Sequence, residues 1–490
     1  MATFFSVVSG EIKMPFRMMS STFCKFLSPI RSRTSFARST VRVSTAGPGG
    51  INPTSLGVAP YKNRSMLPSF SLFSRTCSTQ STTAYFAPPT LKRKEALLDD
   101  YGFKLNDVKM DDIKVDIDNK QLLVSWTNGK TQIYPFVWLR DNCRCSECFH
   151  PEALNRLIQL HQIDVDVVAK SVDISPNGKT LTIHWEGDGH QSQFPSNWLL
   201  LYRFEDSHDD RLLNPKVQFW GSDVDFRRFD FGDLLADDGA LYDWLTELVT
   251  LGIAVVKDAP RELGQLQKLA ARVAFIRPFV YGLTCHVKSP NPNPLHSAYT
   301  TVPMAMHTDI AYYMREAGIV MLHCIQEAEG TDGESLISDG FKVALDLKRA
   351  DPEAFQLLSK YQFEFFDTGR EDHGEFHTHA RHKTIKLDDR GEIEAVAFSD
   401  HSRDAMLRVP VNKVLPIYRA LSKFYDMLLA SENCLKYKLK AGEIMTLNNQ
   451  RALHGRSAFQ GSRHLEVGYM EWDEVNSRIR VLAKNLQNQP

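Results

Sequence analysis

The stretch VPMAMHTDIAYY at residues 302–313, together with IMTLNNQRALHGR at residues 444–456, decides the fold of the largest part of this chain. Both stretches begin with apolar, strand-forming residues, and each carries a histidine, His307 or His454. Side chains alternate along an extended strand, so we expect His307 and Asp309 to project from the same side of one strand. His454 follows Asp309 by 145 residues, so a second strand has to bring it alongside.

Two histidines and one carboxylate form the ligand set that holds non-haem Fe(II) on one face only. The opposite coordination positions then stay open for a cosubstrate and for oxygen. A His-x-Asp tripeptide is common by chance, and a lone histidine is more often a structural residue than a ligand. The strand-forming context of both histidines favours the metal, and Gly455 lets backbone pass close to a bound group. The sequence therefore predicts an iron site at His307, Asp309 and His454.

A further basic residue, Arg463, lies nine positions beyond His454, about one short hairpin away. Its guanidinium is a permanently charged fork that matches the two oxygens of a carboxylate. We expect Arg463 to bind the distal carboxylate of 2-oxoglutarate, the cosubstrate that such an iron site would use with O2.

Composition and charge are those of a globular protein that binds small molecules. The chain has 490 residues, 43% hydrophobic and 24% charged, which suggests two or three domains. The net charge of −1 gives no reason to expect nucleic acid or an anionic membrane as a partner. No run approaches the roughly 18 consecutive apolar residues of a membrane span, so no membrane partner is expected.

Residues 1–95 differ in composition from the rest of the chain. Up to Thr90 there are ten Lys or Arg residues and a single acidic residue, Glu11, among many Ser and Thr residues. An Arg- and Ser-rich, acid-poor leader is typical of an organelle transit peptide, here followed by a Ser/Thr/Pro-rich disordered linker. We expect a mitochondrial protein. The alternative is a disordered N-terminus without a targeting signal, which would leave the protein cytoplasmic.

Residues 100–210 are predicted to form a small β domain. The turn signals Asn128-Gly129 and Asn177-Gly178 separate short strand-forming runs, as in β-hairpins. Between the hairpins, Cys143, Cys145 and Cys148 offer three thiolates within a short stretch of chain.

Zinc in a structural site takes four tetrahedral nitrogen or sulfur ligands, so the three cysteines need a fourth. His150 is close in sequence but not excluded, whereas the turn Gly187-Asp188-Gly189 can present His190. Four protein ligands would leave no open position, which predicts a structural zinc. The alternative is three reduced cysteines without a metal.

Residues 220–490 are predicted to form one large domain. Helical patterns at 241–249, 263–275, 352–361 and 414–429, and a C-terminal helix, flank strand-forming runs that include 253–256 and 318–325. Strands around the metal residues with helices outside suit a jelly-roll barrel. We find no internal repeat, no phosphate-binding glycine loop and no Gly-x-Ser-x-Gly motif in the sequence.

Four motifs together carry a specific resemblance: FVWLRDNCRCSEC at 136–148, HTD at 307–309, LHGR at 453–456 and SRHLE at 462–466. With these motifs in this order, the chain from about Val108 to its C-terminus resembles the gamma-butyrobetaine/trimethyllysine dioxygenase family. That family belongs to the taurine-dioxygenase-like, 2-oxoglutarate-dependent group. The resemblance implies a mainly β fold with flanking helices, a double-stranded β-helix catalytic domain and usually a homodimer.

The resemblance also assigns site residues. It implies iron ligation by His307, Asp309 and His454, with Arg463 as the 2-oxoglutarate clamp. In the mechanism that we expect, Ser335 helps Arg463 to bind this cosubstrate. The resemblance implies zinc ligation by Cys143, Cys145, Cys148 and His190. Ascorbate is a candidate addition to the cofactors Fe(II), Zn(II) and 2-oxoglutarate.

The substrate pocket matches the family less well. The family holds a trimethylammonium group among aromatic ring faces, which attract a cation. The matching positions here are Tyr281, Tyr299 and Tyr469, but a tryptophan expected four residues after Tyr281 is Cys285. Two asparagines that would receive the substrate carboxylate are His296 and Ser399; His296 can still bind a carboxylate.

Three functions follow as expectations. The first is 2-oxoglutarate-dependent hydroxylation of gamma-butyrobetaine to L-carnitine. The second is hydroxylation of trimethyllysine or another quaternary-ammonium acid, which a mitochondrial leader favours. The third, from another class, is a non-catalytic zinc-containing interaction protein; the complete set of iron-ligand residues with Arg463 argues against it.

Overall fold

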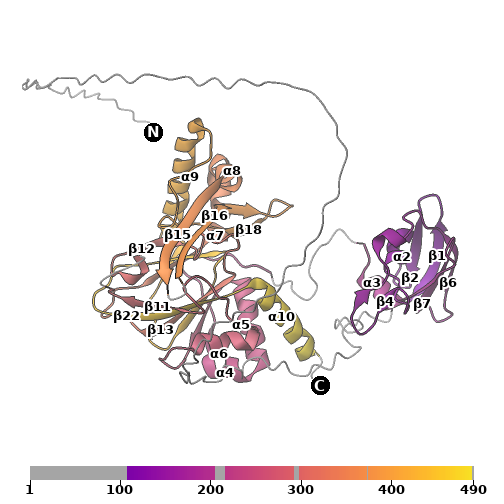
Figure 1. Ribbon diagram of the computed structural model, residues 1–490, viewed down its shortest axis with the longest axis horizontal. Coiled ribbons are helices and arrows are strands. Elements are labelled where there is room, and N and C mark those ends of the chain that lie inside the picture. Colours follow the sequence, from indigo (N-terminus) through magenta and orange to yellow (C-terminus); the bar gives the residue numbers. More distant parts are fainter. Residues whose placement is uncertain (1–107, 205–215, 292–296, 372–373, 488–490) are drawn as a thin grey trace, which may run out of the picture. The chain divides into compact units, whose positions relative to one another are not determined.

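The computed structural model describes residues 108–204, 216–291, 297–371 and 374–487 (Figure 1). The predicted leader and linker over residues 1–95 and the candidate carboxylate-binding residue His296 lie outside this description. Within these four segments, no helix is long and apolar enough to cross a membrane.

The N-terminal β region contains two three-stranded antiparallel sheets in its described part, each followed by a short helix. The first unit consists of β1 (Met110–Asp116), β2 (Gln121–Trp126), β3 (Thr131–Pro135) and α2 (Phe136–Asp141). The second consists of β6 (Ala169–Ile174), β7 (Thr180–Trp185), β8 (Gln191–Pro195) and α3 (Ser196–Leu201). Between them lie β4 (Phe149–His150), β5 (Asn155–Arg156) and the 3₁₀ helix η2 (Leu160–Gln162).

The two units repeat each other, so the expectation of no internal repeat is wrong for this region. The amide of Thr127 donates to the carbonyl of Lys109 in the first unit. At the equivalent place in the second unit, the amide of Glu186 donates to the carbonyl of Val168. Both first strands carry an irregularity at their start, and β2 and β7 alternate between half-buried and buried residues in the same order. Only scattered identities, such as Pro135 and Pro195, mark the repeat in the sequence.

A single apolar core joins the two units. Trp126 and Trp185, at the ends of β2 and β7, are both buried in it, as are Leu139 of α2 and Leu199 of α3. The predicted hairpins are thus confirmed, whereas the two helices were not expected from the sequence.

The second region contains, among the described residues, a six-stranded and a four-stranded sheet. The six-stranded sheet has the order β11 (Cys285–Ser289), β22 (Arg463–Met470), β13 (Ile319–Gln326), β20 (Ile444–Asn448), β10 (Ile253–Lys257) and β9 (Arg228–Asp230). The four-stranded sheet has the order β12 (Met304–His307), β21 (Ala452–Arg456), β14 (Ser335–Asp339) and β19 (Cys434–Tyr437). Strands adjacent in space but distant in sequence are typical of a jelly roll, so the predicted mainly β fold is confirmed.

Helices cover these sheets, as Figure 1 shows. One group comprises α4 (Phe231–Ala236), α5 (Asp238–Thr250), α6 (Gln265–Val273) and α10 (Trp472–Gln487). It packs on the outer face of the six-stranded sheet, where Ala254 and Val256 of β10 contribute to the shared core. The other group comprises α7 (Gly340–Ala350), α8 (Pro352–Lys360) and α9 (Val411–Leu429). Residues of this group join the larger core that contains Ile253 and Val255. The expected helices are present.

A long two-stranded hairpin follows α8 and was not expected from the sequence. It consists of β15 (Gln362–Glu371) and β16 (Gly374–Lys383), and a shorter pair, β17 (Ile385–Leu387) and β18 (Ile393–Val396), comes after it. The 3₁₀ helix η3 (Ser297–Tyr299) precedes β12.

Candidate metal centres and active site

The two predicted iron-binding histidines face each other across a strand pair. His307 is the last residue of β12, His454 is the central residue of β21, and the two are directly paired in the antiparallel register. Their ring centroids are 4.4 Å apart. Gly455 is required for this pairing, because a Cβ there would lie 2.7 Å from the carbonyl oxygen of Met304 on β12. The second strand predicted to bring His454 alongside is therefore β21.

Asp309 does not lie on the strand with His307, which corrects one detail of the expectation. β12 ends at His307, and Asp309 begins the following turn. Ile310 has a φ of 50°, an unusual conformation for a β-branched residue and a sign of strain at a functional site. Asn449, which follows β20, holds the turn: its side-chain oxygen accepts from the Asp309 amide at 2.7 Å, and its nitrogen donates to the Asp309 carbonyl at 3.0 Å.

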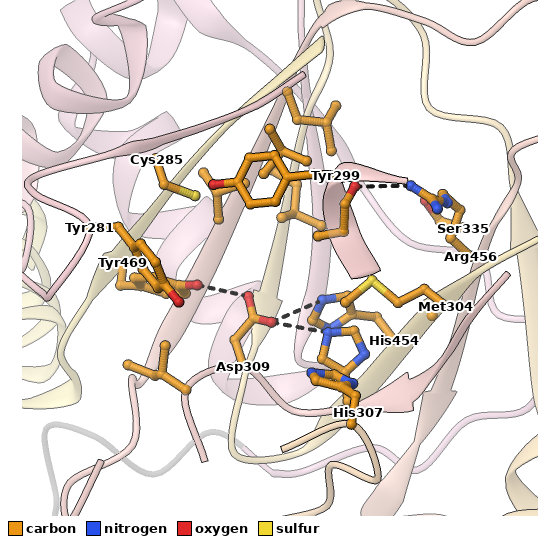
Figure 2. A pocket seen from close by; sticks show the side chains of 18 of the residues that line it. Tyr281, Cys285, Tyr299, Met304, His307, Asp309, Ser335, His454, Arg456 and Tyr469 are labelled. Carbon is orange, nitrogen blue, oxygen red and sulfur yellow. Dashed lines mark hydrogen bonds and ion pairs between the residues drawn. The ribbon is translucent and has the colours of Figure 1, made fainter. Parts of the chain in front are cut away.

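The three side chains converge on one point, with ligand atoms within 4.8 Å of one another (Figure 2). Oδ1 of Asp309 lies 3.1 Å from Nε2 of His307 and 3.6 Å from Nε2 of His454. Ligands about 2.1 Å from one ion and at right angles to each other would be about 3 Å apart. The separations therefore fit three ligands on one face of a single metal ion.

The protonation states also suit metal binding. Nδ1 of His307 lies 2.8 Å from the carbonyl oxygen of Ala305, which assigns the proton to Nδ1 and leaves the Nε2 lone pair free. Burial and the neighbouring His307 lower the pKa of His454 to about 4, so its ring is neutral at pH 7. Burial raises the pKa of Asp309, but His454 and His307 outweigh it and hold that pKa well below its usual value.

Tyr469 supports the carboxylate from the other side. Its hydroxyl donates to Oδ2 of Asp309 at 3.0 Å, so Oδ1 is the oxygen left to face the two histidines. The sequence had placed Tyr469 only in the substrate cage. A group that orients a metal ligand in this way tunes the site without contacting the metal.

A pocket between the two sheets opens beside these ligands (Figure 2). The six-stranded sheet contributes alternate residues of β22, from Arg463 to Tyr469, and residues of β11. The four-stranded sheet contributes His307, His454 and Ser335, the buried first residue of β14. The structure therefore brings Arg463 and Ser335 into the same pocket as the three predicted iron ligands.

Two guanidinium groups line this pocket, and among the described residues only that of Arg456 has hydrogen-bond partners. Arg456 donates to the carbonyl oxygens of Thr300 and Val302 at 2.8 and 2.7 Å. Within the described residues, the side chain of Arg463 makes no hydrogen bond or ion pair, and burial lowers its pKa. A partly buried cation without a protein partner in this part of the chain is suited to bind an anionic ligand.

The predicted aromatic wall is present in the pocket. Tyr281, Tyr299 and Tyr469 all line it, and so does Tyr312, which lies in the turn that begins at Asp309 and which the sequence did not single out. Cys285 lies in the same wall, and burial raises the pKa of its thiol to about 12, so it is neutral.

A third histidine in the pocket was missed. His401 lines the pocket, and its ring centroid lies 4.6 Å from that of His307. Ser399, one of the two departures from the family's asparagines, is buried, bridges His307 by backbone pairing, and has Oγ 3.2 Å from Nε2 of His401. In the sequence, His401 lies two residues after Ser399, which the family resemblance had singled out. This proximity is the one sequence signal that could have indicated His401.

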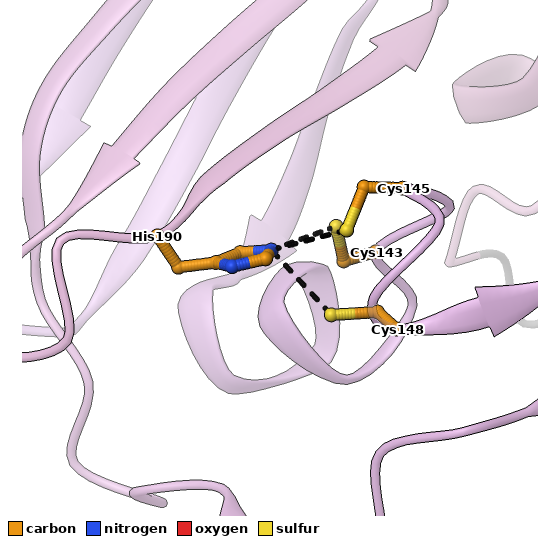
Figure 3. Close-up of side chains that lie close together, drawn as sticks. All are labelled: Cys143, Cys145, Cys148 and His190. Atoms are coloured by element: carbon orange, nitrogen blue, oxygen red, sulfur yellow. Dashed lines mark hydrogen bonds between the residues drawn. The ribbon is translucent and has the colours of Figure 1, made fainter.

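His190 is the fourth residue of the cysteine cluster (Figure 3). Nε2 of His190 lies 3.3, 3.5 and 3.4 Å from the sulfur atoms of Cys143, Cys145 and Cys148. Sulfur and nitrogen ligands of one tetrahedral zinc ion, bound at about 2.3 and 2.05 Å, would be about 3.5 Å apart. His150 is not part of the cluster.

Neighbouring charges support this cluster. Buried Arg140 of α2 donates to the sulfur of Cys148 at 3.4 Å and forms an ion pair with Asp188 at 2.9 Å. Asp188 in turn accepts from the amide of His190 at 2.9 Å. The cluster thus joins the segment after the first repeat unit to the turn between β7 and β8 of the second.

The family model described as "Taurine catabolism dioxygenase TauD, TfdA family" matches residues 209–469, just over half of the chain. The chain belongs to this family. A second model, "Gamma-butyrobetaine hydroxylase-like, N-terminal", matches residues 113–200 of the N-terminal β region.

The chain matches named dioxygenases over most of their length. Human gamma-butyrobetaine dioxygenase is 35% identical over 373 residues, covering 74% of this chain and 95% of the relative. Mitochondrial trimethyllysine dioxygenase of Gallus gallus is 30% identical over 360 residues, covering 71% of this chain and 83% of the relative. A solved structure of an asparagine oxygenase in complex with Fe(II), 3-hydroxyasparagine and succinate has a TM-score of 0.37 and 14% identity, covering 50% of this chain and 93% of the other. As a member of the TauD/TfdA family that is 35% identical to one named dioxygenase and 30% identical to another, the chain is a dioxygenase.

Proposed function

We propose that this dioxygenase hydroxylates gamma-butyrobetaine to L-carnitine and uses Fe(II), 2-oxoglutarate and O2. One oxygen atom would enter a C–H bond of the substrate and the other would enter succinate, with release of CO2. The observation that carries the proposal is the composition of a single pocket, which contains three convergent candidate metal ligands, a guanidinium without a partner among the described residues, and a tyrosine wall.

The metal ligands would hold Fe(II) on the pocket wall. His307, Asp309 and His454 are the proposed ligands, and their separations and protonation states fit one ion. Bound Fe(II) would supply the redox chemistry that couples decarboxylation of 2-oxoglutarate to hydroxylation of a C–H bond. Tyr469 would keep Asp309 oriented through its hydrogen bond.

Arg463 would bind the distal carboxylate of 2-oxoglutarate, with help from the hydroxyl of Ser335. A guanidinium pairs with a carboxylate through two parallel hydrogen bonds, which fixes orientation as well as affinity. The other guanidinium, Arg456, is occupied by backbone carbonyl groups, so Arg463 is the better candidate.

The tyrosine wall would receive the trimethylammonium group. Such a cation cannot donate hydrogen bonds, and ring faces attract it electrostatically. Tyr281, Tyr299 and Tyr469 are the proposed contacts, and this placement would decide which carbon lies nearest the metal. His296 remains the proposed contact for the substrate carboxylate.

Further proposals concern the rest of the chain. Cys143, Cys145, Cys148 and His190 would bind a structural zinc ion. A homodimer, a mitochondrial location and an accessory role of ascorbate follow from the family resemblance and the leader composition. The boundaries 1–95, 100–210 and 220–490 stay our proposed division of the chain.

Succinate release tests the proposal. Purified full-length protein with Fe(II) and 2-oxoglutarate is incubated with gamma-butyrobetaine, trimethyllysine or taurine, and succinate and hydroxylated product are measured. Gamma-butyrobetaine should give the largest stimulation and yield L-carnitine. A stronger response to trimethyllysine would reassign the substrate, and no succinate with any acid would favour the non-catalytic alternative.

A further inference from the structure

The hairpin β15–β16 presents one face to the tyrosine wall of the pocket. Along β15, residues 367, 369 and 371 are half-buried, whereas residues 366, 368 and 370 between them are exposed. On β16, Phe376 lies opposite Gly369 and contacts Tyr281 edge-to-face, with ring centroids 5.5 Å apart. We call this half-buried side the inner face of the hairpin.

Gly369 gives Phe376 the space to lie across the inner face. A Cβ at position 369 would be 2.6 Å from the ring of Phe376, so any larger residue would displace that ring. Tyr281 therefore rests against the hairpin as well as against Phe279, whose ring centroid is 5.6 Å away.

Asp367 of the inner face is tied directly to the wall. The hydroxyl of Tyr281 donates a hydrogen bond to Oδ2 of Asp367. Thr378, the cross-strand partner, donates to the backbone carbonyl of Asp367 at 3.2 Å and so holds the strand beneath the carboxylate. Donation to a carboxylate shifts electron density onto the phenol, which makes the ring face more attractive to a cation.

The inner face carries negative charge that the protein does not neutralise in its described part. Asp367 and Glu371 both lie on this face, and neither forms an ion pair with any described residue. On the exposed side of the same hairpin, by contrast, Glu375 is paired with Arg370 at 3.1 Å. The charge of Glu371 also acts on the wall, since it is among the causes that raise the pKa of Tyr299 after burial itself.

We propose that Asp367 is a specificity-determining residue that makes this pocket select a cationic head group. Asp367 positions Tyr281 and increases the electron density of its ring through the hydrogen bond between them. Glu371 is a second source of negative potential. The inference rests on the proposed function, because it concerns the substrate end of the same pocket. It goes further by naming the source of the charge preference: a carboxylate behind the tyrosine wall, contributed by a hairpin that is separate from the two sheets.

A pair of isosteric acids tests the inference without relying on turnover. Gamma-butyrobetaine and 5,5-dimethylhexanoate share their shape and carboxylate, but only the first has a positive charge. Their Kd values are measured by calorimetry with full-length protein that carries Fe(II) and 2-oxoglutarate, without oxygen. Asp367→Asn should raise the Kd of gamma-butyrobetaine about tenfold and leave the Kd of 5,5-dimethylhexanoate unchanged. Glu375→Gln removes the same charge from the exposed side of the hairpin and should change neither value.

Two outcomes would overturn the inference: an equal effect of Asp367→Asn on both acids, or no effect on either. Should Asp367→Asn fail to fold, Tyr281→Phe decides instead, because it keeps the ring and removes the hydroxyl that donates to Asp367. It should weaken binding of gamma-butyrobetaine alone, and equal weakening of both acids would contradict the inference. Wild-type protein that binds the cation selectively but forms no L-carnitine would refute the proposed function while leaving the inference intact.

Discussion

The two candidate metal centres show how ligand number and surroundings separate a structural site from a catalytic one. At the cysteine cluster, His190 lies within 3.5 Å of all three sulfur atoms, so the four protein groups enclose one point. At the second centre, His307, Asp309 and His454 lie on one wall of a pocket. A closed set of soft ligands stabilises a fold, whereas an open set with a carboxylate leaves positions for reactants.

The two centres also differ in how the chain builds them. The three cysteines are neighbours in sequence, and a tight turn supplies His190. The proposed iron ligands require the pairing of β12 with β21 and the hydrogen bonds from Asn449, and the backbone at Ile310 is strained. Strain of this kind is typical of functional sites and is not needed at the cysteine cluster.

Replacement of His307 by Ala should separate the two centres most clearly. Loss of one of three ligands should reduce 2-oxoglutarate turnover to background, because two remaining ligands cannot hold the ion in place. Zinc content, measured by metal analysis, should stay at the wild-type value. His377→Ala, at an exposed histidine of β16, is the matched control. Retained turnover in His307→Ala would remove this residue from the iron site.

Replacement of Cys148 by Ser should have the converse effect. Structural zinc sites contribute roughly 10–16 kcal/mol of apparent binding energy in small peptides, so the N-terminal β region should lose its cooperative unfolding transition. Zinc analysis and calorimetric unfolding of the variant check this. Cys434→Ser, at a buried cysteine outside both clusters, should keep its zinc. An unchanged zinc content in Cys148→Ser would contradict the assignment.

Replacement of Arg463 by Lys should leave both metal centres in place and weaken the binding of 2-oxoglutarate. Loss of a charge-assisted hydrogen bond costs about 1.5–3 kcal/mol, so the KM for 2-oxoglutarate should rise roughly 10- to 100-fold. Steady-state kinetics with varied 2-oxoglutarate measure this. Arg456→Lys should act mainly on stability, because Arg456 binds backbone carbonyl groups. A larger increase in KM for Arg456→Lys than for Arg463→Lys would mean that Arg456, and not Arg463, binds the cosubstrate.

Replacement of Tyr469 by Phe should have the smallest effect of the four. The ring stays, but Asp309 loses the hydrogen bond to its Oδ2, which should lower iron affinity roughly tenfold. Titration of the apoprotein with Fe(II) without oxygen measures the affinity. Tyr437→Phe, whose hydroxyl bonds Glu443 outside the pocket, should bind iron like wild type. Equal affinity of the two variants would mean that Tyr469 does not support the ligand.

What could be predicted from the sequence depended on whether the signal was local. The cysteine spacing, the strand that ends at His307 and the hairpin turns are local patterns, and the structure contains them. Asp367 and His401 could not be found, because their importance comes from what they contact, Tyr281 and His307, many residues away. The repeat in the N-terminal region was missed for a different reason: backbone hydrogen bonds preserve it, and few side chains do.

X-ray diffraction at the iron absorption edge is the most direct test of the central claim that His307, Asp309 and His454 hold Fe(II) on one face. Crystals of the protein are grown without oxygen in the presence of Fe(II) and 2-oxoglutarate. The claim predicts an anomalous peak about 2.1 Å from Nε2 of both histidines and from Oδ1 of Asp309, with no fourth protein ligand. A peak elsewhere, or a fourth side chain closing the coordination sphere, would contradict it.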